Sequence, residues 1–168
     1  MNEKLIISEQ KTELLNLFLG DEIYLINEPK YYDSIDSEGG NKYRFLNIVM
    51  HTATEIIAPE SKDFFFKMAN AIQNERINMD ADGFAVINIS NYPGLTWQNL
   101  EKLFSPKFCI FWGVDPFTIN IQCHLNKGLM HNGCKIISVE SMEIVKDNLE
   151  MKKKLWAMVQ RMFEMIKK

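Results

Sequence analysis

The residues best suited to chemistry lie at the end of an apolar run, residues 107–114. There Gly113 and Val114 are followed by Asp115 and Pro116. A carboxylate just after the carboxyl end of a strand lies where α/β proteins usually bind their ligands. Asp115 is therefore a candidate general base or nucleophile. In the structural interpretation, Gly113 permits close packing, Asp115 caps a turn and Pro116 ends the strand. The sequence favours the structural interpretation over the catalytic one.

His51 ends another apolar run, residues 43–51, and is a second candidate base because imidazoles exchange protons near neutral pH. No nucleophile accompanies it in the sequence, so a structural role at the end of a strand is favoured.

A third interpretation is a small-ligand binding module at the strand ends, near Trp112 and His51. That interpretation predicts a well-formed pocket at this position.

Two thiols and two imidazoles lie close together in the sequence, at Cys123, His124, His131 and Cys134. These side chains are the common ligands of zinc. Their spacing argues against a metal site, because Cys123 and His124 are adjacent and would point to opposite faces of a strand. No Cys-x-x-Cys pair and no glycine-rich phosphate loop is present. We therefore predict neither a metal nor a cofactor.

The composition indicates one soluble domain, residues 1–168, with a net charge of −3 and 46% apolar residues. Without a strong basic excess, direct strong binding of nucleic acid is not expected. No apolar run approaches the roughly 20 residues that span a bilayer, and the first residues are too charged for a signal peptide. Three cysteines, an odd number, favour reduced thiols. The expected location is the cytoplasm, away from membranes.

Strands and helices alternate along most of the chain. Nearly uninterrupted apolar runs predict strands buried on both faces, and capped segments with apolar stripes at helical spacing predict helices. This alternation predicts an α/β fold, a three-layer α/β/α sandwich with a mostly parallel central sheet of about four to five strands. Residues 117–132 remain open between a strand and an irregular crossing. The predicted strands are residues 43–51, 83–89, 107–114 and 133–139, and the predicted helices are residues 59–73, 96–104, 141–148 and 149–168.

The N-terminal part differs from this core, which comprises residues 43–168. Residues 1–30 are predicted as a helix and strand arm, with the helix over residues 8–19 and a short edge strand over residues 22–26. Residues 31–42, rich in Gly, Ser and Asp, are predicted as a flexible loop. One apolar stripe of the N-terminal helix either docks on a partner or packs on this protein's own sheet. The stripe consists of Leu14, Leu15, Phe18 and Leu19.

Residues 43–166 carry a family resemblance in their later motifs. Residues 108–113 form a strand that ends in Trp and Gly, and residues 134–141 end in Val-x-Ser before a short helix. Asn148 then precedes Leu155 and Trp156 of the last helix. These motifs resemble the psi subunit of the bacterial DNA polymerase III clamp-loader complex. The resemblance implies a compact α/β/α fold, related to uracil-DNA glycosylases but without their catalytic residues.

The resemblance also implies a function. Psi is not an enzyme, and it bridges the clamp loader to the chi subunit, which binds single-stranded-DNA-binding protein. We therefore expect a replication scaffold whose partners are a clamp loader and a chi-like subunit. Psi contacts the clamp loader through a flexible N-terminal segment, whose pattern is not recognisable here. Neither contact is therefore assigned to a residue of this chain.

The alternative is a divergent enzyme with the uracil-DNA glycosylase fold, which would use Asp115 and His51. Residues 113–117 resemble the water-activating loop Gly-Gln-Asp-Pro-Tyr-His of that family, but Val114 replaces the Gln and Thr118 replaces the His. The later His-Pro-Ser segment of that family is also missing. An enzyme needs both groups to face one open cleft. A scaffold instead needs an exposed apolar patch rimmed by polar residues.

Overall fold

The structure is a computed structural model, and it describes residues 30–51, 55–72 and 82–164. The predicted helix over residues 8–19 and the predicted edge strand over residues 22–26 lie outside the described residues. So do the four apolar residues of the N-terminal stripe, Leu14, Leu15, Phe18 and Leu19.

One five-stranded sheet runs through the centre of the described chain, in the order β2-β1-β3-β5-β4. Its first four strands are parallel, and β4 pairs antiparallel with β5 at the edge. All residues of β1, β2 and β3 are buried, as their continuous apolar runs predict. The strands are β1 (Phe45–Val49), β2 (Phe84–Asn88), β3 (Phe108–Trp112), β4 (Lys127–His131) and β5 (Cys134–Val139).

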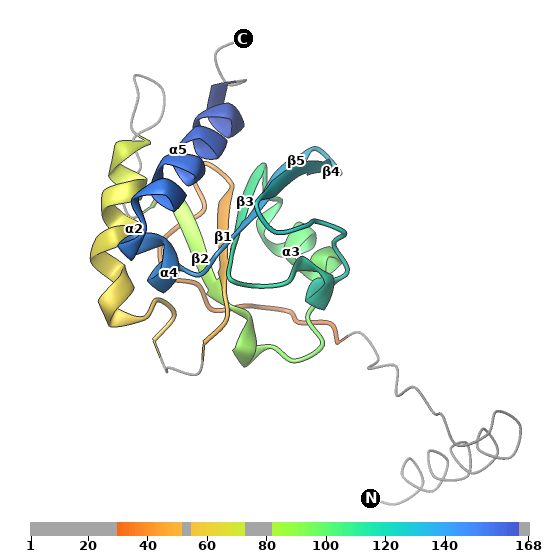
Figure 1. Cartoon of the computed structure of the whole chain (residues 1–168). Coiled ribbons are helices and arrows are strands. Elements are labelled where there is room, and N and C mark those ends of the chain that lie inside the picture. The colour runs from red at the N-terminus through yellow and green to blue at the C-terminus, as the bar shows by residue number, and fades with distance from the viewer. Residues whose placement is uncertain (1–29, 52–54, 73–81, 165–168) are drawn as a thin grey trace, which may run out of the picture.

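Helices cover both faces of the sheet, so the predicted three-layer α/β/α sandwich is confirmed. Figure 1 shows α2 (Pro59–Ala71), α4 (Met142–Asp147) and α5 (Leu149–Glu164) on one side and α3 (Trp97–Phe104) on the other. Two apolar clusters result, one under α2, α4 and α5 and one under α3. Within the described ranges, no helix is long and apolar enough to cross a membrane.

The residues at the element boundaries explain where the elements begin and turn. Pro59 occupies the first turn of α2, where a missing N–H costs no hydrogen bond. At the start of α3, the side-chain oxygen of Asn99 accepts two hydrogen bonds from Thr96, one from its backbone N–H at 3.2 Å and one from its hydroxyl at 2.8 Å. Between β4 and β5, Asn132 and Gly133 both have positive φ, 48° and 79°, which is typical of a two-residue type I′ hairpin turn.

Residues 31–42, predicted as a flexible loop, form a loop without a helix or strand, and this loop contacts the core at several positions. Glu38 forms an antiparallel bridge with Val86 of β2, with N···O distances of 3.0 and 2.9 Å. The hydroxyl of Tyr32 donates to the carbonyl of Pro93 at 2.8 Å, and the side chain of Ile35 packs against the apolar cluster under α3. This segment therefore lies against the outer edge of β2 as part of the fold.

Residues 117–132, which the sequence left open between a strand and an irregular crossing, contain a crossing followed by a strand. The short 3-10 helix η2 (Pro116–Ile119) follows β3, and an irregular crossing leads to β4, the antiparallel edge strand. The sequence did not predict β4 as a separate strand, because its five residues include Gly128 and show no clear alternation of apolar and polar residues.

Candidate functional site

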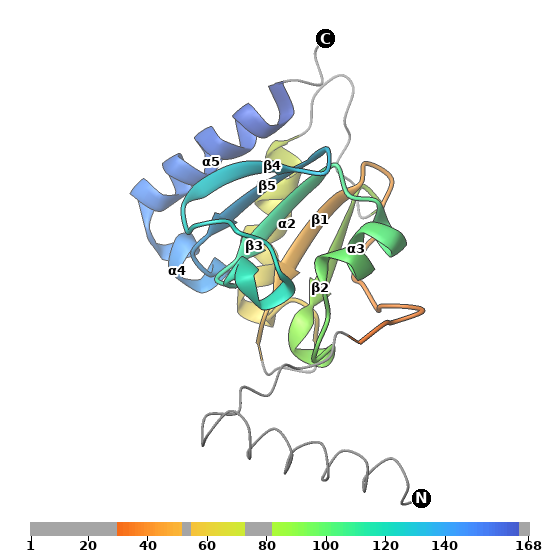
Figure 2. The same cartoon turned by 90° about the vertical axis from the view of Figure 1, so that its right-hand side faces the viewer.

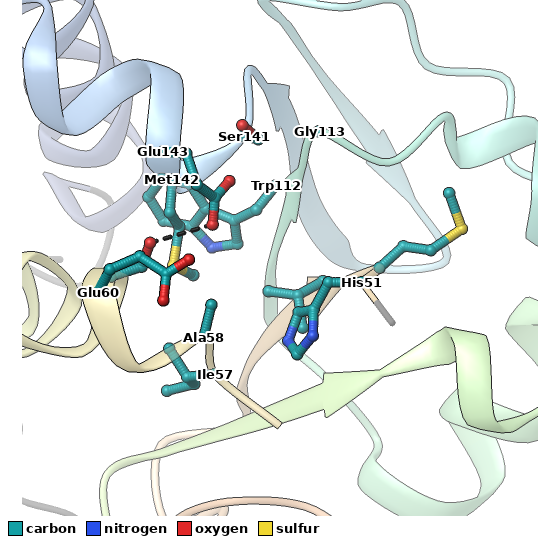
Figure 3. A pocket seen from close by; sticks show the side chains of 12 residues that line it. His51, Ile57, Ala58, Glu60, Trp112, Gly113, Ser141, Met142 and Glu143 are labelled. Carbon is teal, nitrogen blue, oxygen red and sulfur yellow. Dashed lines mark hydrogen bonds between the residues drawn. The ribbon is translucent and has the colours of Figure 1, made fainter. Parts of the chain in front are cut away.

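The carboxyl ends of β1, β3 and β5 meet at one edge of the sheet, where a cavity of about 280 Å³ opens (Figure 3). Three of the predicted candidates, His51, Trp112 and Gly113, line it together. The start of α4 contributes Ser141 and Glu143 to the same wall. This arrangement follows from the parallel topology, because parallel strands end at a common edge.

His51 is held in place by the structure around it. Its Nε2 lies 2.7 Å from the carbonyl oxygen of Ile56, so this nitrogen carries the proton and donates it. Its Nδ1 faces the Nδ2 of Asn88 at 3.5 Å, and its backbone carbonyl accepts hydrogen bonds from Asn88 Nδ2 and Ser90 Oγ, at 2.9 and 2.6 Å. The imidazole and the backbone carbonyl of His51 thus tie the end of β1 to Ile56, Asn88 and Ser90.

Trp112 gives the cavity a rigid apolar wall. Its side chain is buried, and its indole Nε1 donates to the side-chain oxygen of Asn47 on the neighbouring strand at 3.1 Å. The rings of Phe64 and Phe65 in α2 pack edge-on against the indole, each with 6.4 Å between ring centroids. Because its polar atom is already paired inside the protein, Trp112 offers a ligand only an apolar surface.

Glu143 is a residue of this cavity that the sequence analysis did not single out. Its Oε1 accepts a hydrogen bond from Ser61 Oγ at 3.0 Å, drawn as a dashed line in Figure 3. Burial acts to raise the pKa of Glu143. Hydrogen bonds from its own backbone N–H and from the hydroxyls of Ser141 and Ser61, with the charge of Lys146, outweigh burial and lower that pKa. The sequence could have indicated this residue, because Glu143 lies in the first turn of the predicted helix that starts at Ser141.

Asp115 lines a different cavity, of about 370 Å³, on the other side of Gly113. Its Oδ1 accepts a hydrogen bond from the backbone N–H of Phe117 at 3.0 Å, so the carboxylate caps η2. Its backbone carbonyl accepts from the hydroxyl of Thr118 at 2.8 Å. Pro116 is buried at the first position of η2, and the prediction that it ends the strand is wrong, because β3 already ends at Trp112. Asp115 and His51 therefore do not face one cleft, as an enzyme using both would require.

The second cavity lies beside an exposed apolar pair. The side chains of Phe117 and Leu125 are 51% and 49% exposed, and both line the cavity. Asp115, His124 and Glu140 line the same cavity, so its lining also carries polar side chains. We call Phe117, Leu125 and these three polar residues the strand-end patch.

Ser138 lines the second cavity, but its hydroxyl is enclosed by the protein. The hydroxyl of Ser138, on β5, is buried and has no hydrogen-bond partner among the described residues.

The thiols and imidazoles do not form a metal centre in the described part of the chain, where no group of three or more His, Cys, Asp or Glu residues could hold an ion. Cys109, Cys123 and Cys134 are buried free thiols. Burial raises the pKa of Cys134 to about 12, with a smaller contribution from the charge of Glu101. The ring of His131 packs edge-on against Trp97, with 6.0 Å between ring centroids.

Comparison of the whole chain with known protein families and with curated proteins finds no match to either.

Proposed function

We propose that this protein is a non-enzymatic, psi-like scaffold that bridges a clamp loader to a chi-like partner in cytoplasmic DNA replication. The proposal rests on the motif resemblance of residues 43–166 and on one structural observation, the strand-end patch. Phe117 and Leu125 are half exposed beside a cavity that three polar residues also line. An exposed apolar pair beside polar residues is what protein-binding surfaces show.

The candidate catalytic residues support a scaffold over an enzyme. Asp115 is engaged in capping η2, and the ring of His51 is engaged with Ile56 and Asn88. These engagements stabilise the local fold, and because Asp115 and His51 line different cavities, they are not placed over one substrate site. Phe117 and Leu125, exposed at this edge, are apolar, which suits the contact of a partner.

The experiment measures binding of the purified protein to the purified clamp-loader complex and chi-like subunit of its source organism, by surface plasmon resonance. Phe117→Glu and Leu125→Glu place a charge in the centre of the strand-end patch. Each is expected to weaken binding roughly 10-fold or more, as for a buried interface anchor. Leu149→Glu is the matched control, because Leu149 is 65% exposed at the start of α5, on the far side of the sheet.

Two results would count against this proposal. If the wild-type protein binds neither partner, the proposal of a replication scaffold is contradicted. Binding that Leu149→Glu weakens as much as Phe117→Glu would move the contact away from the strand-end patch.

A second candidate function, small-ligand binding, is favoured by the 280 Å³ cavity that His51, Trp112 and Gly113 line. Its volume is close to the roughly 300 Å³ at which small-molecule pockets begin. Glu60 and Glu143 add carboxylates to an apolar wall, which suits a small amine. Titration with an amine fragment set should then shift the amide resonances of Gly113 and Glu143, and unchanged resonances would remove this candidate.

A further inference from the structure

The two edges of the sheet differ. The outer edge of β2 carries the bridge between Glu38 and Val86, so the segment before β1 partly covers it. At the other end of the sheet, β4 pairs with β5 and has no second strand partner among the described residues. An uncovered edge presents backbone N–H and C=O groups that are ready to pair with another strand.

The hairpin turn determines which backbone groups of β4 point outward. A two-residue type I′ turn closes the strands with a hydrogen-bonded pair, here His131 with Cys134. Hydrogen-bonded pairs alternate along an antiparallel ladder, so Leu129 also bonds toward β5. The N–H and C=O groups of Gly128 and Met130 therefore point away from the sheet.

A hollow of about 430 Å³ lies beside this edge, between β4 and α5. Its lining is mostly apolar and includes Gly128 and Ile137 of the sheet with Met158 and Met162 of α5. Met130 lines it as well and is 55% exposed. Gly128 and Met130 are two residues apart, so they face the same side of the sheet. Figure 2 shows β4 at the end of the sheet nearest α5.

We propose that this edge binds a second copy of the chain, with two β4 strands paired antiparallel about a two-fold axis at Leu129. In this register each Met130 lies directly opposite the partner's Gly128. The outward groups of these residues would form four backbone hydrogen bonds, two for each such pair. The side chain of each Met130 would lie over the partner's Gly128 and against the apolar lining of the hollow, where Ile137 Cγ2 comes within 3.3 Å of the position that a Cβ atom on Gly128 would take.

Self-complementarity is the reason to choose a second copy as the occupant. The protruding residue, Met130, and the position without a side chain, Gly128, lie symmetrically on either side of Leu129. A two-fold axis through Leu129 matches both at once, as an isologous interface requires. The strand ends bring Lys127 opposite the partner's His131, so no pair joins two lysines or two carboxylates. Methionine adapts its shape readily to an irregular apolar space.

The first test measures the mass of the full-length protein by sedimentation equilibrium over a range of concentrations. Met130→Pro removes an outward N–H and leaves the hydrogen bonds to β5 intact, so the variant should fold and dimerise at least 10-fold more weakly. Met130→Leu keeps the N–H and an apolar side chain and should still dimerise. A wild-type protein that stays monomeric at every concentration overturns the proposal.

The second test fixes the register, and it does not depend on whether Met130→Pro folds. Across the axis the two Leu129 residues form a non-hydrogen-bonded pair about 4.5 Å apart between Cα atoms, a separation that a disulfide can bridge. Under mild oxidation, Leu129→Cys should give a covalent dimer. In Lys127→Cys the two thiols would lie four residues apart along the strands, about 14 Å, so cross-linking should be much slower. Equal cross-linking of the two variants, or none in Leu129→Cys, overturns this register.

Discussion

Gly113 and Ser141 approach so closely that a side chain at residue 113 has no space. A Cβ atom built on Gly113 would lie 2.7 Å from the Cβ of Ser141, and the φ angle of Gly113 is +62°. The backbone N–H of Gly113 also donates to the carbonyl of Val139 at 2.9 Å. This contact joins the end of β3 to the segment between β5 and α4, and it shapes the wall shared by the two cavities.

Gly113→Ala is therefore expected to destabilise the protein by about 2–4 kcal/mol, from the strain of a positive φ plus the overlap with Ser141. Gly133→Ala is the matched control, because Gly133 has a φ of +79° but a Cβ atom there would meet no other atom within 4 Å. The free energy of unfolding of Gly133→Ala should therefore fall only by the conformational cost of the positive φ, about 1 kcal/mol. Urea unfolding measures both losses, and equal losses would show that the contact with Ser141 costs nothing.

Asp115→Ala is expected to lower the free energy of unfolding by roughly 0.5–2 kcal/mol, because the backbone N–H of Phe117 loses its acceptor. Asp115→Asn keeps an acceptor oxygen and should lose less. The same three proteins are assayed for uracil release from DNA, and none is expected to release it. Release by the wild type, abolished in Asp115→Ala, would contradict the scaffold proposal and make Asp115 catalytic.

The sequence predicted the layers well because their signals are local. The apolar runs that become β1, β2, β3 and β5 are nearly uninterrupted, and such runs are typical of strands buried on both faces. Edge strand β4 lacked this signal, since one face of it stays in solvent. Glu38 was also missed as a strand partner, because its bridge to Val86 depends on a contact 48 residues away in the chain.

The candidate site was predictable only in part. His51, Trp112 and Gly113 share a cavity because each follows or ends a parallel strand, which a strand assignment alone can predict. The separation of Asp115 from His51 was not predictable, because it depends on the direction in which the chain leaves β3 after Gly113. The contact between Ser61 and Glu143 joins α2 to α4, and no sequence pattern indicates which helices lie side by side.

Glu143 should contribute stability that depends on pH. Its pKa in the folded protein is below the ordinary value of 4.5, so the folded state favours the ionised form. That contribution is fully present above the unfolded-state pKa and is lost as the pH falls through the lower, folded-state pKa. The difference in unfolding free energy between wild type and Glu143→Gln should thus be largest near neutral pH and shrink below about pH 4.5.

Glu150→Gln serves as the control for Glu143→Gln, because it removes the same charge from an exposed residue near the start of α5. Ser61→Ala should reduce the pH dependence due to Glu143, since Ser61 is one of its hydrogen-bond donors. A difference between wild type and Glu143→Gln that stays constant from pH 7 to pH 3 would contradict the lowered pKa.

The three cysteines should be unreactive in the folded protein. Burial raises the pKa of all three thiols, and that of Cys134 reaches about 12 from an ordinary 9.0. Three pKa units correspond to roughly 1000-fold less thiolate at pH 8, and the thiolate is the form that both attacks disulfide reagents and binds zinc. Labelling with a disulfide reagent should therefore be slow in buffer and fast for all three thiols in urea. Added Zn²⁺ should leave the labelling rate in buffer unchanged. Fast labelling of one thiol in buffer would instead identify a reactive cysteine. Suppression of that labelling by Zn²⁺ would identify a metal-binding cysteine.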